Sequence, residues 1–428
     1  MMSVTAARGR GSGRVPVTGY FVLYGVVLAV WVTRIPAIKQ HLGLSDGLLG
    51  AALLGLPAGV LLVALVAGRL VDRAGSARVS CAGGVAMALL LITPALAGSA
   101  AWLVVSLLAF GIAAGALNVG MNANGVVVER ASGRRVMTSL HAGYSLGALA
   151  GSVVGGLFAR AGAGPLPTFL ATALPCAVYA AVAGRWLLTE ASARAVTPLT
   201  PAPAAAPALA TADRGAGRLP GHRALRPGPL IALLGLTGLC ALLAEGAAAD
   251  WSAVYLRDNL GTSAGFAAAG FAAFSIAMAA SRLLGDRLVA RFGPAALVRA
   301  SGVTAAAGLA GGLIIGTPAA ALAGFAVLGA GLACIAPQVF LAAGHADPAR
   351  PGHGLARVVG LSYLGMVGGP AVIGAVASLT GLPLALGIPV LLALCVAALA
   401  WAVAVPSAAG PAVAGAQLAQ PGRTSPDS

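Results

Sequence analysis

Twelve long apolar segments, separated by short polar ones, constrain this chain more than any other feature. Each is close to the ~20 residues that an α-helix needs to cross the ~30 Å hydrocarbon core of a bilayer. Backbone groups in lipid must be hydrogen-bonded within the chain, and these segments are too long and too evenly apolar for barrel strands. The sequence therefore predicts an all-α integral membrane protein with twelve transmembrane helices, at residues 16–34, 46–70, 77–97, 101–128, 136–159, 166–188, 229–250, 263–284, 294–316, 319–344, 355–378 and 383–405.

The composition also indicates that the protein is embedded in a lipid bilayer. Hydrophobic residues make up 59% of the 428 residues and charged residues only 9%, too few to cover a soluble domain of this size. The net charge of +15 does not indicate nucleic-acid binding, because the arginines fall in short clusters between apolar runs and Lys39 is the single lysine.

The basic residues also predict the orientation. With the N-terminus in the cytoplasm, all of them lie on the cytoplasmic side except Arg34, Lys39, Arg160 and Arg257. Cytoplasmic loops of membrane proteins carry such an excess of arginine and lysine. An even number of spans then places both termini in the cytoplasm.

The chain divides into two halves of six helices. We expect a cytoplasmic N-terminal tail (1–15), a first half (16–189), a Pro-rich cytoplasmic linker (190–228), a second half (229–405) and a disordered tail (406–428).

Sequence echoes recur at a fixed offset of 218 residues between the halves. Leu42-Gly-Leu-Ser45 matches Leu260-Gly-Thr-Ser263, and further pairs are Arg69 with Arg287, Arg73 with Arg291 and Gly75 with Gly293. Six spans per repeat give both halves the same topology, related by an axis along the membrane normal.

The segment Gly68-Arg-Leu-Val-Asp-Arg-Ala-Gly75 follows the second span and predicts a tight polar turn at the membrane surface. This Gly-x-x-x-Asp-Arg-x-Gly pattern, the twelve spans and the central linker resemble the major facilitator superfamily. The second half departs from the pattern, because Ala290 stands where the first half has Asp72, and Asp286 where it has Gly68.

Three further stretches resemble one poorly characterised bacterial branch of that superfamily, distantly similar to sugar–proton symporters of the fucose-permease kind. They are Trp31-Val-Thr-Arg-Ile-Pro36, Ala244-Glu-Gly-Ala-Ala-Ala-Asp-Trp251 and Asn118-Val-Gly-Met-Asn-Ala-Asn124. The resemblance implies a monomeric multi-pass transporter of the bacterial cytoplasmic membrane.

The same resemblance gives the polar segment a role as a cytoplasmic gate. In the superfamily the aspartate of this motif faces the start of span 11, whose positive dipole end attracts it. The residues carried over are Gly68, Asp72, Arg73, Gly75 and Arg78. The alternative is a solvated loop that only sets topology.

Span 4 carries a polar stripe. Gly111, Gly115, Asn118 and Asn122 are spaced 4, 3 and 4 residues apart and share one helix face. Amides facing lipid are costly, so we expect this face to point into the bundle, where Asn118 and Asn122 line a substrate site. The alternative is that both residues only join helices.

Glu245 is an ionisable residue predicted to lie inside hydrocarbon, 16 residues after Pro229. A carboxyl group at this depth is by default a functional-site hypothesis. We expect Glu245 to couple transport to protons, or to close an outer gate with Arg34 at the end of span 1; Asp250 is the alternative partner of Arg34. A static ion pair and direct substrate binding are the remaining interpretations.

Four more residues are secondary candidates. His141 and Tyr144 begin span 5, and His141 has either a proton role or a packing role. Tyr144, together with Gln338 in span 10 and Tyr363 in span 11, is a candidate for substrate contact.

These features predict a secondary transporter, working by alternating access, for a small polar solute. A sugar-like compound is the candidate solute, and the proton is the expected coupling ion.

The alternatives are a drug–proton antiporter and a non-transporting sensor or scaffold. The glycines from Gly147 to Gly156 resemble the antiporter motif, but Ser152 stands where proline is expected, and small-residue packing explains them equally well. No nucleotide-binding loop or nucleophile–base pattern is present, so we expect no cofactor, no metal and no enzymatic activity.

Overall fold

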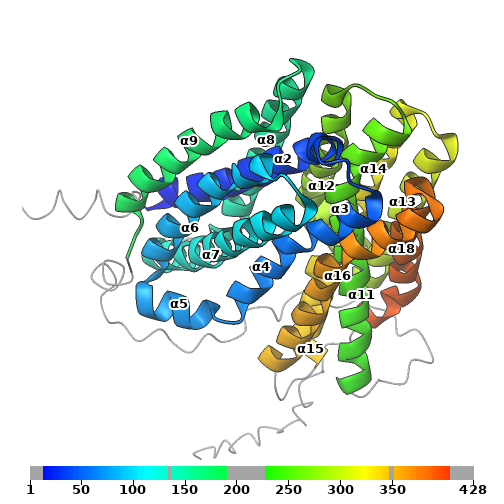
Figure 1. Cartoon of the computed structure of the whole chain (residues 1–428). Helices are drawn as coiled ribbons and strands as arrows, with labels where there is room; N and C mark the ends of the chain where they lie inside the picture. The colour runs from blue at the N-terminus through cyan, green and yellow to red at the C-terminus, as the bar shows by residue number, and fades with distance from the viewer. Residues whose placement is uncertain (1–12, 134–135, 190–226, 347–350, 405–428) are drawn as a thin grey trace, which may run out of the picture.

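The computed structural model describes residues 13–133, 136–189, 227–346 and 351–404, and all regular structure within these ranges is helical. Within them, twelve helices or helix pairs are long and apolar enough to cross a membrane. Figure 1 shows them as two groups, in blue to green and in green to red. The prediction of an all-α membrane protein with twelve spans is confirmed. The predicted N-terminal tail up to residue 12, the linker up to residue 226 and the C-terminal tail lie outside the described residues.

The first group holds six spans, and their elements are α2 (Arg14–His41), α3 (Asp46–Leu53), α4 (Gly55–Ala64), α5 (Ala67–Ala74), α6 (Ser76–Leu90), η1 (Thr93–Leu96), α7 (Ala100–Ser132), α8 (Met137–Arg160), α9 (Pro165–Ala183) and η2 (Gly184–Trp186). The second group has the elements α11 (Pro227–Val254), η3 (Tyr255–Asn259), α12 (Ala264–Phe292), α13 (Pro294–Ile315), α14 (Pro318–Leu332), α15 (Ile335–Ala346), α16 (Pro351–Thr380), α17 (Leu382–Ala385), α18 (Gly387–Leu399) and η4 (Ala400–Val403).

Two predicted boundaries are wrong in an informative way. Helix α2 continues to His41, so Arg34 lies inside the helix and not at its end, and Pro36 is accommodated within it. The predicted tight turn after span 2 is largely the short helix α5. Gly68 lies within that helix, and only Gly75 takes the positive φ, 81°, that a turn requires.

The 218-residue repeat reappears in the helix boundaries. Helices α3 and α12 begin at Asp46 and Ala264, α6 and α13 at Ser76 and Pro294, and α7 and α14 at Ala100 and Pro318. Local interactions repeat as well: the Ser45 hydroxyl accepts a hydrogen bond from the Leu48 N–H, and the Ser263 hydroxyl from the Phe266 N–H. These serines are N-caps, which satisfy amides that a helix start leaves free.

The two halves meet closely at one end of the bundle, which the arginine distribution assigns to the outside and which we call the outer end. A Cβ atom placed on Gly50 of α3 would lie 2.8 Å from the Gly374 Cα of α16. A Cβ atom on Gly265 of α12 would lie 3.1 Å from the Arg160 Cβ of α8. Helix backbones of opposite halves therefore approach closely here, with little side-chain volume between them.

Toward the other end the halves diverge. Helix α5 packs on α6 and α7 of its own half, and α15 packs chiefly on α11 and α16 of its own half. In Figure 1 α5 lies at the lower left, away from the lower ends of α11 and α15. The structure is thus closed at the outer end.

This geometry makes a steric prediction. Gly374→Leu forces a side chain into the contact between α3 and α16, where overpacking costs about 1–3 kcal/mol, so the outer-closed conformation loses population. A cysteine introduced in place of Leu53, which is 2% exposed on α3, should then react faster with a hydrophilic thiol reagent in a background without native cysteines.

Gly368→Leu is the matched control, because Gly368 lies on the same helix and a Cβ atom there meets nothing within 4 Å. Equal reaction rates in the two variants would contradict the assignment of this contact to outer closure.

Candidate functional site

Glycines bring helix backbones into contact within each half. A Cβ atom on Gly25 of α2 would overlap the Tyr144 carbonyl oxygen of α8, and one on Gly147 of α8 would overlap the Val22 carbonyl oxygen of α2. In the second half, a Cβ atom on Gly365 of α16 would overlap the Leu239 carbonyl oxygen of α11. Packing accounts for Gly147 of span 5 and for the equivalent Gly365 of span 11.

Close packing of α2 on α8 places two tyrosines beside each other. The ring centroids of Tyr24 and Tyr144 are 5.8 Å apart. The Asn118 amide of α7 donates to the Tyr24 hydroxyl at 3.4 Å. The Asn122 amide donates to the Asn118 side-chain oxygen at 2.9 Å and to its backbone carbonyl at 2.8 Å. Phenol and amide groups from three helices of the first half thus form one connected polar group.

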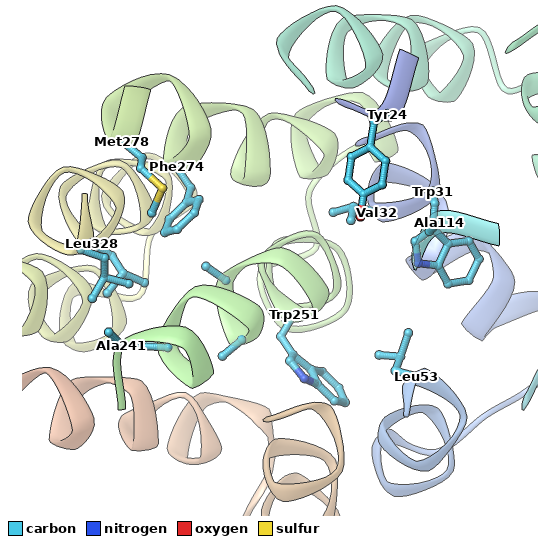
Figure 2. Close-up of a cluster of buried hydrophobic side chains, with 14 of the residues drawn as sticks. Tyr24, Trp31, Val32, Leu53, Ala114, Ala241, Trp251, Phe274, Met278 and Leu328 are labelled. Atoms are coloured by element: carbon cyan, nitrogen blue, oxygen red, sulfur yellow. The ribbon is translucent and has the colours of Figure 1, made fainter. Parts of the chain in front are cut away.

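Large apolar side chains lie on the outer side of this polar group. Figure 2 shows Tyr24 on the same helix as Trp31, with Trp251 of α11 in the region between the two halves. Trp31 and Trp251 are 1% and 0% exposed, so both are core residues in this conformation. Their rings fill space on the outer side of the polar residues.

The two glycines of the span 4 stripe have a different role from the asparagines. A Cβ atom on Gly111 would overlap the Leu56 carbonyl oxygen of α4, and one on Gly115 would lie 3.0 Å from the Val60 Cα. They allow α7 to pack on α4, whereas half-buried Asn118 reaches Tyr24 of α2 and half-buried Asn122 is hydrogen-bonded to Asn118. The predicted stripe therefore combines packing positions with polar positions.

The second half supplies charge to the same region. Glu245 of α11 is half-buried and interacts electrostatically with Arg282 of α12, with Tyr144 of α8 and with Tyr363 of α16. Arg282 also interacts with His141 of α8 and donates through Nε to the Ala333 carbonyl oxygen at 3.4 Å. The charged groups of the second half thus lie within electrostatic range of Tyr144 and His141 of the first.

Arg282 is a residue that the sequence analysis missed. The charge pattern assigns it to the cytoplasmic side, near the end of span 8. Helix α12 continues for ten residues beyond it, to Phe292. A basic residue within a long helix, in the span that follows a buried carboxylate, is the signal that could have identified it.

His141 makes a packing contact and is also accessible to solvent. Its ring packs edge-on against Phe21, with centroids 5.2 Å apart, yet the side chain is exposed and lies near Arg282. Its role in proton movement stays a prediction.

Arg34 does not form the expected ion pair in this conformation. Its side chain is buried and donates to the Ala163 carbonyl oxygen in the loop between α8 and α9. Among the described residues, the ion pairs within 4.0 Å are Lys39–Asp46 and Lys39–Asp258. Neither Glu245 nor half-buried Asp250 is therefore bound to Arg34 here, because Arg34 is directed toward the loop of its own half.

Two further candidates can offer polar atoms to a ligand. The Gln338 Oε1 atom of α15 is buried and finds no hydrogen-bond partner among the described residues, and Tyr363 is 41% exposed although it lies on an inner helix. Buried polar atoms normally find partners, so this unpaired acceptor keeps Gln338 among the candidate contacts for a ligand.

The residues of the predicted cytoplasmic gate lie on or beside α5. The side chains of Asp72, Arg73 and Arg78 are exposed, and no ion pair joins them to another residue in the described part of the chain. This is consistent with a chain closed at the outer end, and the gate role stays a prediction.

Asn124 and Asn122 should differ in what they contribute. Asn124 is fully buried and donates to the Ser76 hydroxyl at 3.1 Å and to the Leu188 carbonyl oxygen at 2.7 Å, so it joins α7 to two neighbours. Asn124→Ala should lower the apparent melting temperature in detergent, since losing a buried partner costs about 1–3 kcal/mol.

Asn122→Ala is the matched control, because Asn122 is half-buried and its described hydrogen bonds go only to Asn118 within its own helix. We expect it to melt close to the wild type and to reduce transport. A larger loss of stability in Asn122→Ala than in Asn124→Ala would contradict this division.

Comparison with known proteins agrees with the fold. The profile of the Major Facilitator Superfamily matches residues 17–345. An uncharacterized MFS-type transporter of Yersinia pestis is 32% identical over 386 residues, covering 90% of this chain and 94% of the relative. The crystal structure of a bacterial homologue of the human lysosomal transporter Spinster, in an inward-facing and occupied conformation, superimposes with a TM-score of 0.69 at 14% identity, covering 91% of this chain and 95% of that one. That of a D-xylose–proton symporter gives a TM-score of 0.68 at 16% identity, covering 92% and 98%. The chain belongs to the Major Facilitator Superfamily of membrane transporters.

Proposed function

We propose that this protein is a proton-coupled secondary transporter for a small polar, uncharged solute, with sugar-like compounds as the first candidates. The observation that carries the proposal is the half-buried carboxylate of Glu245, which faces Arg282, Tyr144 and Tyr363 between the two halves without an ion pair closer than 4.0 Å in the described residues. Ionisable groups at this depth are costly and occur at ion and substrate pathways.

The polar group of the first half would bind the solute. Asn118, Asn122 and Tyr144 offer amide and phenol groups, and Tyr363 and Gln338 add a phenol and a free amide oxygen from the second half. Together they present donors and acceptors without net charge, which suits hydroxyl groups. Because the ligands come from both halves, solute binding and the relative position of the halves depend on each other.

Glu245 and Arg282 would connect this site to the proton. An ionised Glu245 attracts Arg282, whose side chain is exposed while that of Glu245 is half-buried. Proton uptake removes it and frees Arg282 to move. The electrostatic link between α11 and α12 therefore changes with the proton, while His141 beside Arg282 offers a second protonation site.

Arg282 also bears on the alternative of drug–proton antiport. A cationic drug would need Glu245 as its counter-charge, but Arg282 already places a positive charge near that carboxylate. A neutral polar solute meets no such repulsion. Transport of a neutral polar solute is therefore the function that this arrangement favours.

The cellular setting of the proposal rests on the arginine distribution and on the fold. We propose a monomer in the bacterial cytoplasmic membrane with both termini inside, so that the outer end of the bundle faces away from the cytoplasm. Protons would then enter along their gradient through the outer-open conformation.

A ligand screen tests the function directly. The purified protein is melted in detergent with sugars, polyols, nucleosides, amino acids and cationic dyes, since a ligand of the folded state stabilises it by RT ln(1 + [L]/Kd). A sugar or polyol that stabilises the protein and enters proteoliposomes supports the proposal. Stabilisation by cationic dyes alone would favour efflux, and absence of transport with any binder would favour a sensor.

Glu245→Gln separates proton coupling from solute binding. The amide keeps the shape but cannot release a proton, so accumulation driven by a pH gradient should fall to the level of empty liposomes. Solute exchange between equal internal and external pools needs no net proton movement and should persist. Gradient-driven accumulation equal to that of the wild type would show that Glu245 is not the coupling residue.

Glu245→Asp serves as the control, because it keeps an ionisable group within one methylene of the original position. We expect partial recovery of gradient-driven accumulation. Failure of both variants in the exchange assay would instead indicate damage to the solute site or the fold.

A further inference from the structure

The outer end of the bundle contains a charged cluster that the transport mechanism above does not use. Lys39, near the end of α2, forms ion pairs with Asp46 of α3 at 2.7 Å and with Asp258 of η3 at 2.6 Å. The Gln40 side-chain amide donates to the other oxygen of Asp258 at 3.1 Å. Because α2 and α3 belong to the first half and η3 to the second, the bonds to Asp258 join the two halves.

Two helices, α2 and α11, extend beyond the ends predicted for spans 1 and 7, and these extensions carry the cluster. Helix α2 continues past Arg34 to His41, which carries Lys39 and Gln40 outward. On the other side, α11 continues as the π-helical turn Tyr255–Asn259, and the Leu260 N–H donates to the Tyr255 carbonyl oxygen at 3.2 Å. A single π-turn inserts one residue into a helix and so turns the following side chains by about 100°, and such turns are frequent at functional sites.

The two halves differ at this point although their helix boundaries repeat. At the 218-residue offset, Arg257 corresponds to Lys39 and Asp258 to Gln40. Arg257 does not reach the other half through a described hydrogen bond or ion pair; it donates to the Thr262 carbonyl oxygen at 2.6 Å, after its own helix. Lys39 alone of this pair crosses between the halves.

The arrangement of the two carboxylates suggests how the contact can open. The side chains of Lys39, Asp46 and Asp258 are 13%, 22% and 23% exposed, so the cluster is mostly shielded from water. When the halves separate at the outer end, Asp258 leaves with the second half and Asp46 stays beside Lys39. An ammonium left without a partner in a shielded site would be costly, and Asp46 avoids that cost.

We propose that Lys39, Gln40 and Asp258 form an outer latch that holds the outer-closed conformation, with Asp46 keeping Lys39 paired when the latch opens. The latch lies at the same end of the bundle as the contacts of Gly50 with Gly374 and of Gly265 with Arg160. It controls access and is independent of which solute or ion is carried.

The single lysine of the chain gives a direct assay. The full-length protein in lipid nanodiscs is treated with an amine-acylating reagent, and acylation at Lys39 is followed by peptide mass spectrometry, which separates it from the N-terminal amine. A second readout uses the parent variant Leu53→Cys without native cysteines, whose introduced thiol is buried in the outer-closed structure. The rate at which a hydrophilic thiol reagent modifies this introduced thiol reports outer opening.

Asp258→Asn and Asp46→Asn form a matched pair, since both remove one carboxylate from Lys39. Asp258→Asn should increase the rates of both Lys39 acylation and thiol modification by about two- to five-fold, the range expected for a partly exposed ion pair. Asp46→Asn should leave the thiol-modification rate near that of the parent variant, because its bond lies within one half. Lys39→Arg should abolish acylation and keep the parent rate of thiol modification.

The double variant Lys39→Asp with Asp258→Lys exchanges the two charges and distinguishes loss of the ion pair from loss of folding. It should restore the slow thiol modification that Asp258→Asn loses, at an unchanged melting temperature. The proposal is overturned if Asp258→Asn and Asp46→Asn change the thiol-modification rate equally, or if neither changes it. These results do not depend on a transported solute, so they stand apart from any failure of the proposed transport function.

Discussion

Direct contact between helix backbones at glycine positions is the interaction on which the rest of the structure depends. In lipid there is little hydrophobic gain from joining two apolar helices, so association relies on close van der Waals packing. Gly25 and Gly147 allow α2 and α8 to touch, and Gly365 allows the same for α16 and α11. These four helices carry Tyr24, Tyr144, Glu245 and Tyr363, whose mutual positions the glycines therefore set.

The duplicated scaffold carries different chemistry in its two halves. At the 218-residue offset, Glu245 corresponds to Val27, Arg282 to Ala64 and Asn118 to Ala336. The first half contributes amides and phenols, and the second contributes the carboxylate and the guanidinium in addition to the phenol of Tyr363 and the amide of Gln338. A symmetric frame with asymmetric polar groups places a neutral polar surface opposite a charged one, and relative movement of the halves changes the distance between them.

Sequence reasoning predicted the spans because length and apolarity alone decide them in a bilayer, and the offset of the repeat reappears in the starts of α3 and α12. It failed where a helix leaves the bilayer, as α2 does beyond Arg34. The run of apolar residues ends at the bilayer surface, whereas the helix continues into water. Sequence reasoning placed Arg282 near the end of its span for the same reason, although α12 continues to Phe292. It also missed the pairing of Lys39 with Asp258, since no local pattern indicates which charges of separate halves meet.

The outer contact between the halves combines two kinds of interaction that separate easily. At Gly50 and Gly374 the backbones of α3 and α16 approach each other directly, so no side chain separates them at that point. Lys39 exchanges two carboxylate partners for one, so the lysine keeps a counter-charge. Contacts within each half are more extensive, since α2 packs along α8 and α11 along α16 over much of their length. Such packing favours movement of each half as a rigid unit, with the weaker contact between the halves at the outer end opening and closing. Alternating access requires movement of this kind.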